Sequence, residues 1–173
     1  RQLEGEIAEE WNLENMEKSE NMEKLLPLVK DVVSFDMKHS AEIQACDLLM
    51  EIDQLDLITQ HMDQSNYPRV CLYLIGCASY VVEPESTQIL QGVLDTYLRF
   101  GEYPRALLVA MQLHDKDKCE RVFNACNDQL IKKQLCYMLA RQYIPLEIDD
   151  EDLRTILLNA HINDHFLSLA REL

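Results

Sequence analysis

The residues of this 173-residue chain with the most potential for chemistry are its six cysteines and five histidines. No two cysteines form a Cys-x-x-Cys pair, and most lie among apolar residues at helical intervals, where a free thiol packs as a small hydrophobic side chain. No Asn-x-Ser/Thr sequon is present either. The pattern predicts free thiols in a reducing compartment. The cysteines are Cys46, Cys71, Cys77, Cys119, Cys126 and Cys136.

Two histidines, His161 and His165, have the spacing that places two imidazoles on one helix face. The glutamate of a His-Glu-x-x-His motif is absent, because Ile162 follows His161. We also expect Asn163 to cap the last helix and so to interrupt the helix between the two histidines. A structural zinc ion needs four ligands, and the neighbouring residues do not supply them. We predict neither a metal site nor a bound cofactor.

Catalytic motifs are missing as well. The four glycines are isolated from one another, so no glycine-rich loop can hold a phosphate. No Gly-x-Ser-x-Gly elbow is present, and no base, nucleophile and orienting group emerge together. We therefore predict that the chain is not an enzyme and has no catalytic residues.

The acidic residues cluster instead of converging on a cleft. One cluster is Glu4, Glu6, Glu9 and Glu10, and the other is the run 149–152. Carboxylates at helix starts are stabilised by the helix dipole and stay hydrated. We interpret both clusters as solvated faces or caps, with a docking patch for a basic partner as the alternative.

The overall charge restricts the partners of the chain. Asp and Glu number 31 against 16 Lys and Arg, which gives a net charge of −15. Such a chain repels nucleic acid and anionic membrane surfaces. The longest uncharged run, 70–82, is shorter than the roughly 20 residues that span a bilayer. We predict no nucleic-acid partner and no membrane segment.

Two small features remain candidates for binding. Lys132, Lys133 and Arg141 form the nearest approach to a basic patch, which weakly suggests phosphate binding. Trp11, in a charged neighbourhood, is either an exposed partner-binding residue or a cover for the apolar face of the next helices. The second interpretation is favoured, because amphipathic helices usually bury their largest residue. The residues that bind partners are otherwise unknown from the sequence.

The elements that would carry these residues are helices. Apolar residues recur every three to four positions, Gly and Pro are few, and period-two alternation is absent. Leu25, Leu28, Val29 and Val32 form one predicted stripe, with Pro27 in the first turn of its helix. Pro68, Pro84 and Pro104 begin further helices, Gly101 ends one, and Asp115, Asp128 and Asp149–Asp150 are predicted caps.

About ten short helices with brief connections predict an all-α fold, an irregular α-solenoid of stacked antiparallel helical hairpins. We expect one helical-repeat-like region over 1–173, with an acidic helix and connector over 1–20 and stacked helices over 21–173. There is no initiator Met, and the chain stops within a helical pattern. We therefore expect it to be a fragment of a longer protein.

Several sequence blocks resemble one family. The blocks are Ala45–Ile52, Val70–Leu74, Val82–Glu85, Phe100–Leu107 and Phe166–Leu173. In order and spacing they are similar to the N-terminal helical region of the large non-ATPase scaffold subunit (subunit 2) of the proteasome regulatory particle.

The resemblance implies a non-catalytic scaffold segment of the base of the regulatory particle, acting in ubiquitin-dependent protein degradation in the cytoplasm and nucleus. Its implied partners are other proteasome subunits, in particular the coiled coils of the ATPase ring. Ubiquitin and shuttle receptors would bind only the downstream toroid, which this chain lacks. The alternative is a helical-repeat adaptor of another complex, such as vesicle-coat or kinase-scaffold machinery.

Overall fold

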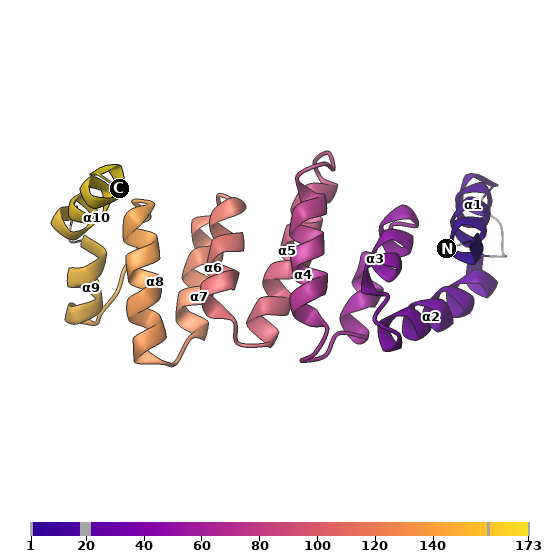
Figure 1. The fold of residues 1–173 in the computed structure, drawn as a ribbon, viewed down its shortest axis with the longest axis horizontal. Helices are drawn as coiled ribbons and strands as arrows, with labels where there is room; N and C mark the ends of the chain where they lie inside the picture. The colour runs from indigo at the N-terminus through magenta and orange to yellow at the C-terminus, as the bar shows by residue number, and fades with distance from the viewer. Residues whose placement is uncertain (1, 18–21, 159, 173) are drawn as a thin grey trace. The chain divides into compact units, whose positions relative to one another are not determined.

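The computed structural model describes the backbone of residues 2–17, 22–158 and 160–172. These residues form helices and connections and contain no strand, as predicted (Figure 1). The helices are α1 Gln2–Glu17, α2 Met22–Lys38, α3 Glu42–Glu51, the 3₁₀ helix η1 Leu55–Gln60, α4 Tyr67–Ala78, α5 Glu85–Arg99, α6 Tyr103–Gln112, α7 Lys116–Ala125, α8 Gln129–Arg141, α9 Glu151–Leu158 and α10 Ala160–Glu172.

The chain divides into two compact units, residues 1–96 and residues 97–173, which are described separately. The boundary lies inside α5. In the first unit α1, α2 and α3 contact one another, and η1 and α4 pack against α3. In the second unit α6 contacts α7 and α8, and α8 contacts α9 and α10. Neighbouring helices therefore pack together within each unit, as expected for a helical stack. The single region predicted over 1–173 stays a prediction.

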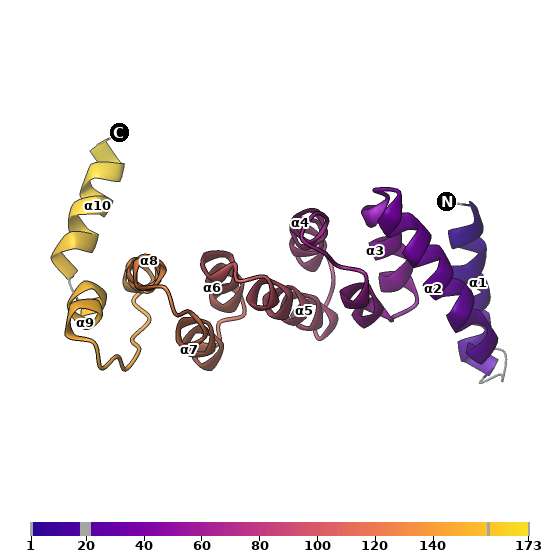
Figure 2. The same ribbon diagram turned by 90° about the horizontal axis from the view of Figure 1, so that it is seen from below.

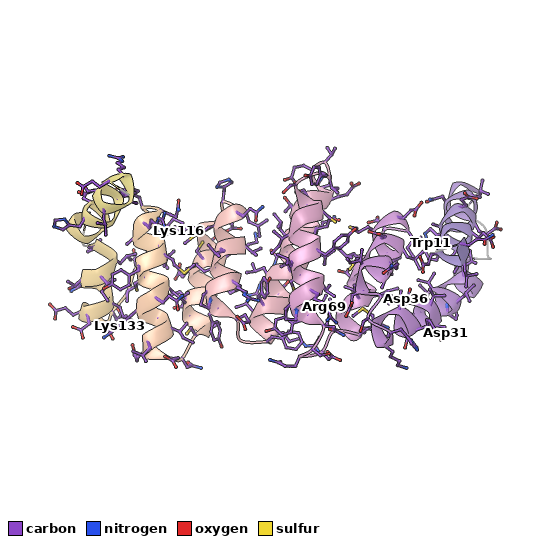
Figure 3. All side chains as sticks on the ribbon, viewed as in Figure 1. Trp11, Asp31, Asp36, Arg69, Lys116 and Lys133 are labelled. Atoms are coloured by element: carbon purple, nitrogen blue, oxygen red, sulfur yellow. The ribbon has the colours of Figure 1, made fainter. Side chains whose placement is uncertain are left out.

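The core of the first unit contains the only tryptophan. The side chain of Trp11 is 4% exposed and is buried on the same face of α1 as Ile7. Figure 3 labels Trp11 between the ribbons of α1 and α3. Burying a ring of this size removes a large apolar area from water. The interpretation of Trp11 as a cover for the neighbouring helices is confirmed.

The helix that carries Pro27 begins earlier than predicted. It starts at Met22, so Pro27 lies inside α2 rather than in its first turn. The predicted stripe is also partly wrong, because Leu28 is 41% exposed. Val29 is buried as predicted, and the buried face of α2 continues with Val33 and Met37. Contacts with α1 and α3 decide which face is buried, and the choice is not set by the first apolar residues alone.

Most predicted helix boundaries agree with the structure. The carboxylates of Asp115, Asp128 and Asp150 each accept hydrogen bonds from two backbone N–H groups in the first turns of α7, α8 and α9. Pro68 stands in the first turn of α4, and Gly101 ends α5 with a φ of +74°. These residue types are suited to their positions: aspartate supplies an acceptor, and glycine adopts a positive φ without strain.

The predicted break at Asn163 is wrong. The helix α10 runs without interruption from Ala160 to Glu172, so Asn163 is neither its cap nor a break. Asn163 is the fourth residue of this helix, within its first turn. A residue with modest helix propensity is tolerated there, and packing against α8 outweighs its weak preference.

The core of the second unit is formed by α6 to α9. Figure 2 shows α6 and α8 in one row and α7 in the other. The short turn between α6 and α7 joins them into a predicted hairpin, while residues 142–150 form a longer connection from α8 to α9. The most buried large side chains here are Leu107, Val122, Leu135 and Leu139. This packing fixes which face of α8 remains in solvent.

Candidate interaction surfaces

Two polar contacts fasten α3 to α4. The guanidinium of Arg69 donates to the carboxylate of Glu42, whose side chain is only 6% exposed. One turn further along each helix, the hydroxyl of Tyr73 donates to Asp47. This hydrogen bond, together with desolvation, raises the pKa of Tyr73, because it stabilises the protonated phenol. The pair of contacts fixes the register of the two helices.

The outer face of α2 is the first candidate surface. It exposes Leu28, Asp31 and Phe35, and the Phe35 side chain is 60% exposed. The Phe35 ring stacks on His39, with ring centroids 4.0 Å apart. His39 Nδ1 lies 2.7 Å from the Phe35 carbonyl oxygen, which holds the imidazole in place. An exposed and locally fixed aromatic pair of this kind is typical of protein contact surfaces.

The buried side of α2 carries a carboxyl group next to this surface. Asp36 is 7% exposed, and its Oδ2 atom has no hydrogen-bond partner among the described residues. Burial, followed by the negative charge of Glu4, raises the pKa of Asp36. Asp31 and Asp36 are both labelled in Figure 3. Only Asp31 is accessible to a partner.

The outer face of α8 is the second candidate surface. It exposes Leu130 and Tyr137 together with Lys133, Gln134 and Arg141. The predicted basic patch is therefore split. Lys132 lies over the Phe123 ring of α7, with Nζ 5.4 Å from the ring centroid, whereas Lys133 and Arg141 reach solvent.

The acidic clusters lie in solvent, as interpreted from the sequence. Glu6, Glu9 and Glu10 are exposed on α1, while Glu4 is half-buried. In the second cluster Asp150 caps α9, and Asp149, Glu151 and Asp152 are exposed. These carboxylates do not converge on a common point within the described residues, and they act as a hydrated face and a helix cap.

All six cysteines are free thiols, and five of them are buried. Burial raises the pKa of Cys46 to about 12 and that of Cys136 to about 11, because the thiolate would lose its hydration. Such thiols are inert at neutral pH, which agrees with their predicted packing role. Cys77 alone is partly exposed.

Metal ligands do not gather in the described part of the chain. No three His, Cys, Asp or Glu residues there are arranged to hold an ion. His165 is exposed, whereas the side chain of His161 lies outside the described residues. Among the helices that the structure describes, none is both long and apolar enough to cross a lipid bilayer.

Reasoning from the sequence missed the exposed aromatic residues of both candidate surfaces. Trp11 was the aromatic residue that it singled out, yet Trp11 is buried while Phe35 and Tyr137 are exposed. A signal was present, because Phe35 lies opposite Val29 and Val33 on a helical wheel. In the same way Tyr137 lies opposite Leu135 and Leu139.

Comparison with known proteins agrees with the resemblance. Residues 1–173 match the RPN1 N-terminal domain. The chain belongs to this family. The relatives include the 26S proteasome non-ATPase regulatory subunit 2 homolog B of Arabidopsis thaliana, 40% identical, and the non-ATPase regulatory subunit 2 of Dictyostelium discoideum, 38% identical. The regulatory subunit rpn1 of Schizosaccharomyces pombe is 36% identical.

Each of these three alignments covers all of this chain and about a fifth of the relative. The family is thus one of proteasome regulatory subunits, and the Arabidopsis and Dictyostelium relatives are named as non-ATPase subunits. This agrees with the prediction that the chain is not an enzyme.

Proposed function

We propose that this chain is a scaffold segment of the base of the proteasome regulatory particle and serves ubiquitin-dependent protein degradation. The observation that carries the proposal is the family match over all of residues 1–173, at 36–40% identity to the three named relatives. A scaffold works by holding partners in a fixed geometry. Helices that pack pairwise and are fastened by contacts such as Arg69–Glu42 supply that rigidity.

Its partners, on this proposal, are other proteasome subunits, with the coiled coils of the ATPase ring as the direct contact. The outer face of α2 suits such a partner. It combines exposed Leu28 and Phe35 with Asp31, Lys38 and His39, so both apolar and charged groups are available. Coiled-coil helices present charged residues of both signs beside their apolar seam.

Ubiquitin and shuttle receptors are assigned to the part of the protein beyond this chain, and the cellular location to the cytoplasm and nucleus. The chain would bind neither nucleic acid nor membranes, because its net charge of −15 opposes both.

The experiment is a binding assay with purified, dissociated subunits of the regulatory particle. The immobilised chain should retain ATPase subunits, and Leu28→Ser/Phe35→Ser should release them. Leu72→Ser is the matched control, because Leu72 is 71% exposed on α4 and belongs to another surface. Circular dichroism checks that each variant remains helical.

Failure to retain any proteasome subunit would refute the proposal. Recovery of vesicle-coat or kinase-scaffold subunits from a competing mixture would favour the alternative, a helical-repeat adaptor of another complex. Tight binding of free ubiquitin by the chain itself would contradict the assignment of ubiquitin to the downstream part.

A further inference from the structure

We propose that the outer face of α8 is a docking site for an acidic amphipathic helix of a partner protein. The α8 face, as we name it, consists of Leu130, Lys133, Gln134, Tyr137 and Arg141. The inference depends on this surface alone and goes beyond the proposed function, which concerns a different helix.

The helical geometry makes these five residues one continuous surface. Spacings of three and four residues bring Leu130, Lys133, Tyr137 and Arg141 onto a single side of α8. The opposite side carries Leu135 and Leu139, both fully buried. Leu130 is 78% exposed and Tyr137 is 41% exposed, so two large apolar side chains on one side of α8 are accessible to a partner.

The charge of this helix is opposite to that of the chain. Residues Gln129–Arg141 include three basic residues and no acidic one, within a chain of 31 acids and 16 bases. The nearest acid before it, Asp128, is engaged by the backbone N–H groups of Leu130 and Ile131. Neither Lys133 nor Arg141 has an ion-pair partner among the described residues.

The contrast also holds between the two units. Residues 1–96 contain 19 Asp and Glu against 6 Lys and Arg, whereas residues 97–173 contain 12 against 10. Much of the negative charge is thus on the first unit. An acidic partner would be repelled by the first unit and attracted to the α8 face.

The neighbouring helix is also compatible with an acidic partner. The helix α6 contacts α8 and lies in the same row in Figure 2. It also contains no acidic residue, and it exposes Leu108 at 58%. Lys116, by contrast, is labelled in Figure 3 and is the first residue of α7, which lies in the other row in Figure 2. It is equally basic and exposed but is separate from the α8 face.

The chemistry of the partner follows from the layout. Leu130 and Tyr137 lie about two turns apart on this side of α8, Lys133 lies between them, and Arg141 lies about one turn beyond Tyr137. A complementary ligand presents leucine or isoleucine at helical spacing, flanked by Asp or Glu. Since α8 has 13 residues, it is about 20 Å long, and a partner helix of about four turns matches it.

The test uses a display library of helical peptides with one randomised face. The library is selected against the full chain and counter-selected against the Lys133→Glu/Arg141→Glu variant. We expect the enriched peptides to be acidic with an apolar stripe. Their affinity should fall at least about tenfold in this variant and in Tyr137→Ser, and it should weaken with salt. Lys116→Glu is the matched control and should change affinity less than about twofold.

Several results would overturn the proposal. One is a selection that yields no peptide dependent on Lys133 and Arg141, or yields neutral or basic peptides. Another is an equal loss of affinity in Lys116→Glu, which would indicate general electrostatic attraction. A third is displacement of the peptides by single-stranded RNA. The last is self-association of the chain, detected by sedimentation and abolished by Lys133→Glu/Arg141→Glu, because the occupant would then be a second copy. Thermal unfolding verifies that the variants fold.

Discussion

At the scale of single residues, the contact between Glu42 and Arg69 illustrates how solvent exposure determines the contribution of an ion pair to stability. The carboxylate of Glu42 is nearly buried, while Arg69 remains 61% exposed. A buried charge left without its partner loses hydration that nothing else replaces. An exposed pair, such as Arg105 with Glu102 at 3.8 Å, can recover that hydration from water.

We expect Arg69→Ala to lower the free energy of unfolding by about 1–2 kcal/mol, between the values for surface and buried pairs. Urea denaturation measures the change. Arg105→Ala is the control and should cost less than about 0.5 kcal/mol. Adding Glu42→Gln to Arg69→Ala should restore part of the loss, because no buried charge is then left unpaired. If the two arginine substitutions lowered the free energy of unfolding equally, the burial of Glu42 would not determine the strength of its ion pair.

At the scale of elements, two glycines near α5 have different backbone conformations. Gly92 lies inside the helix, whereas Gly101 follows it at a positive φ. Gly101, just after α5, has a φ of +74°, a backbone conformation that residues with a side chain rarely adopt. Gly92 lies inside the same helix, and a Cβ atom there would meet nothing within 4 Å. The same change of residue should therefore have opposite effects at the two positions.

Gly101→Ala should lower the free energy of unfolding by about 1 kcal/mol, because alanine is strained at positive φ. Gly92→Ala should raise it by about 0.5–1 kcal/mol, because alanine restricts the unfolded chain and favours the helix. Thermal unfolding of the two variants and of the parent chain measures the direction of both changes in stability. Stabilisation by Gly101→Ala would contradict the conformation assigned to this turn.

At the scale of the whole molecule, the open question is whether residues 1–173 act as one region. The structure divides into two compact units, and the sequence contains one tryptophan, Trp11, buried in the first of them. Trp11 fluorescence therefore reports the first unit alone, whereas circular dichroism reports helices in both. The two signals can be compared during one denaturation.

If the chain is one region, as the sequence predicts, both signals should change at the same denaturant concentration. Stacked helices that contact only their neighbours transmit stability along the chain, so a single transition needs strong coupling between adjacent helices. Two separated midpoints would refute the single region. The Trp11→Phe variant is the control: it should lose the tryptophan fluorescence transition while its helices still unfold in a circular dichroism transition.

The sequence by itself determined the features that depend on local interactions. The aspartate caps and Gly101 agree with the structure. Each requires only one residue and the backbone groups a few positions away. The all-helical fold and the family resemblance could likewise be predicted, since the periodicity and the order and spacing of the sequence blocks are properties of the chain itself.

For α2 and α8, the tertiary structure decided which of the apolar side chains are covered. Leu28 and Phe35 are as apolar as Val29 and Val33, yet only the latter pair is buried, because α1 and α3 lie on that side of α2. The same holds for Leu130 and Tyr137 on α8, and for α10, which continues through Asn163. Burial depends on neighbours distant in sequence, and a periodic pattern does not specify where those neighbours lie.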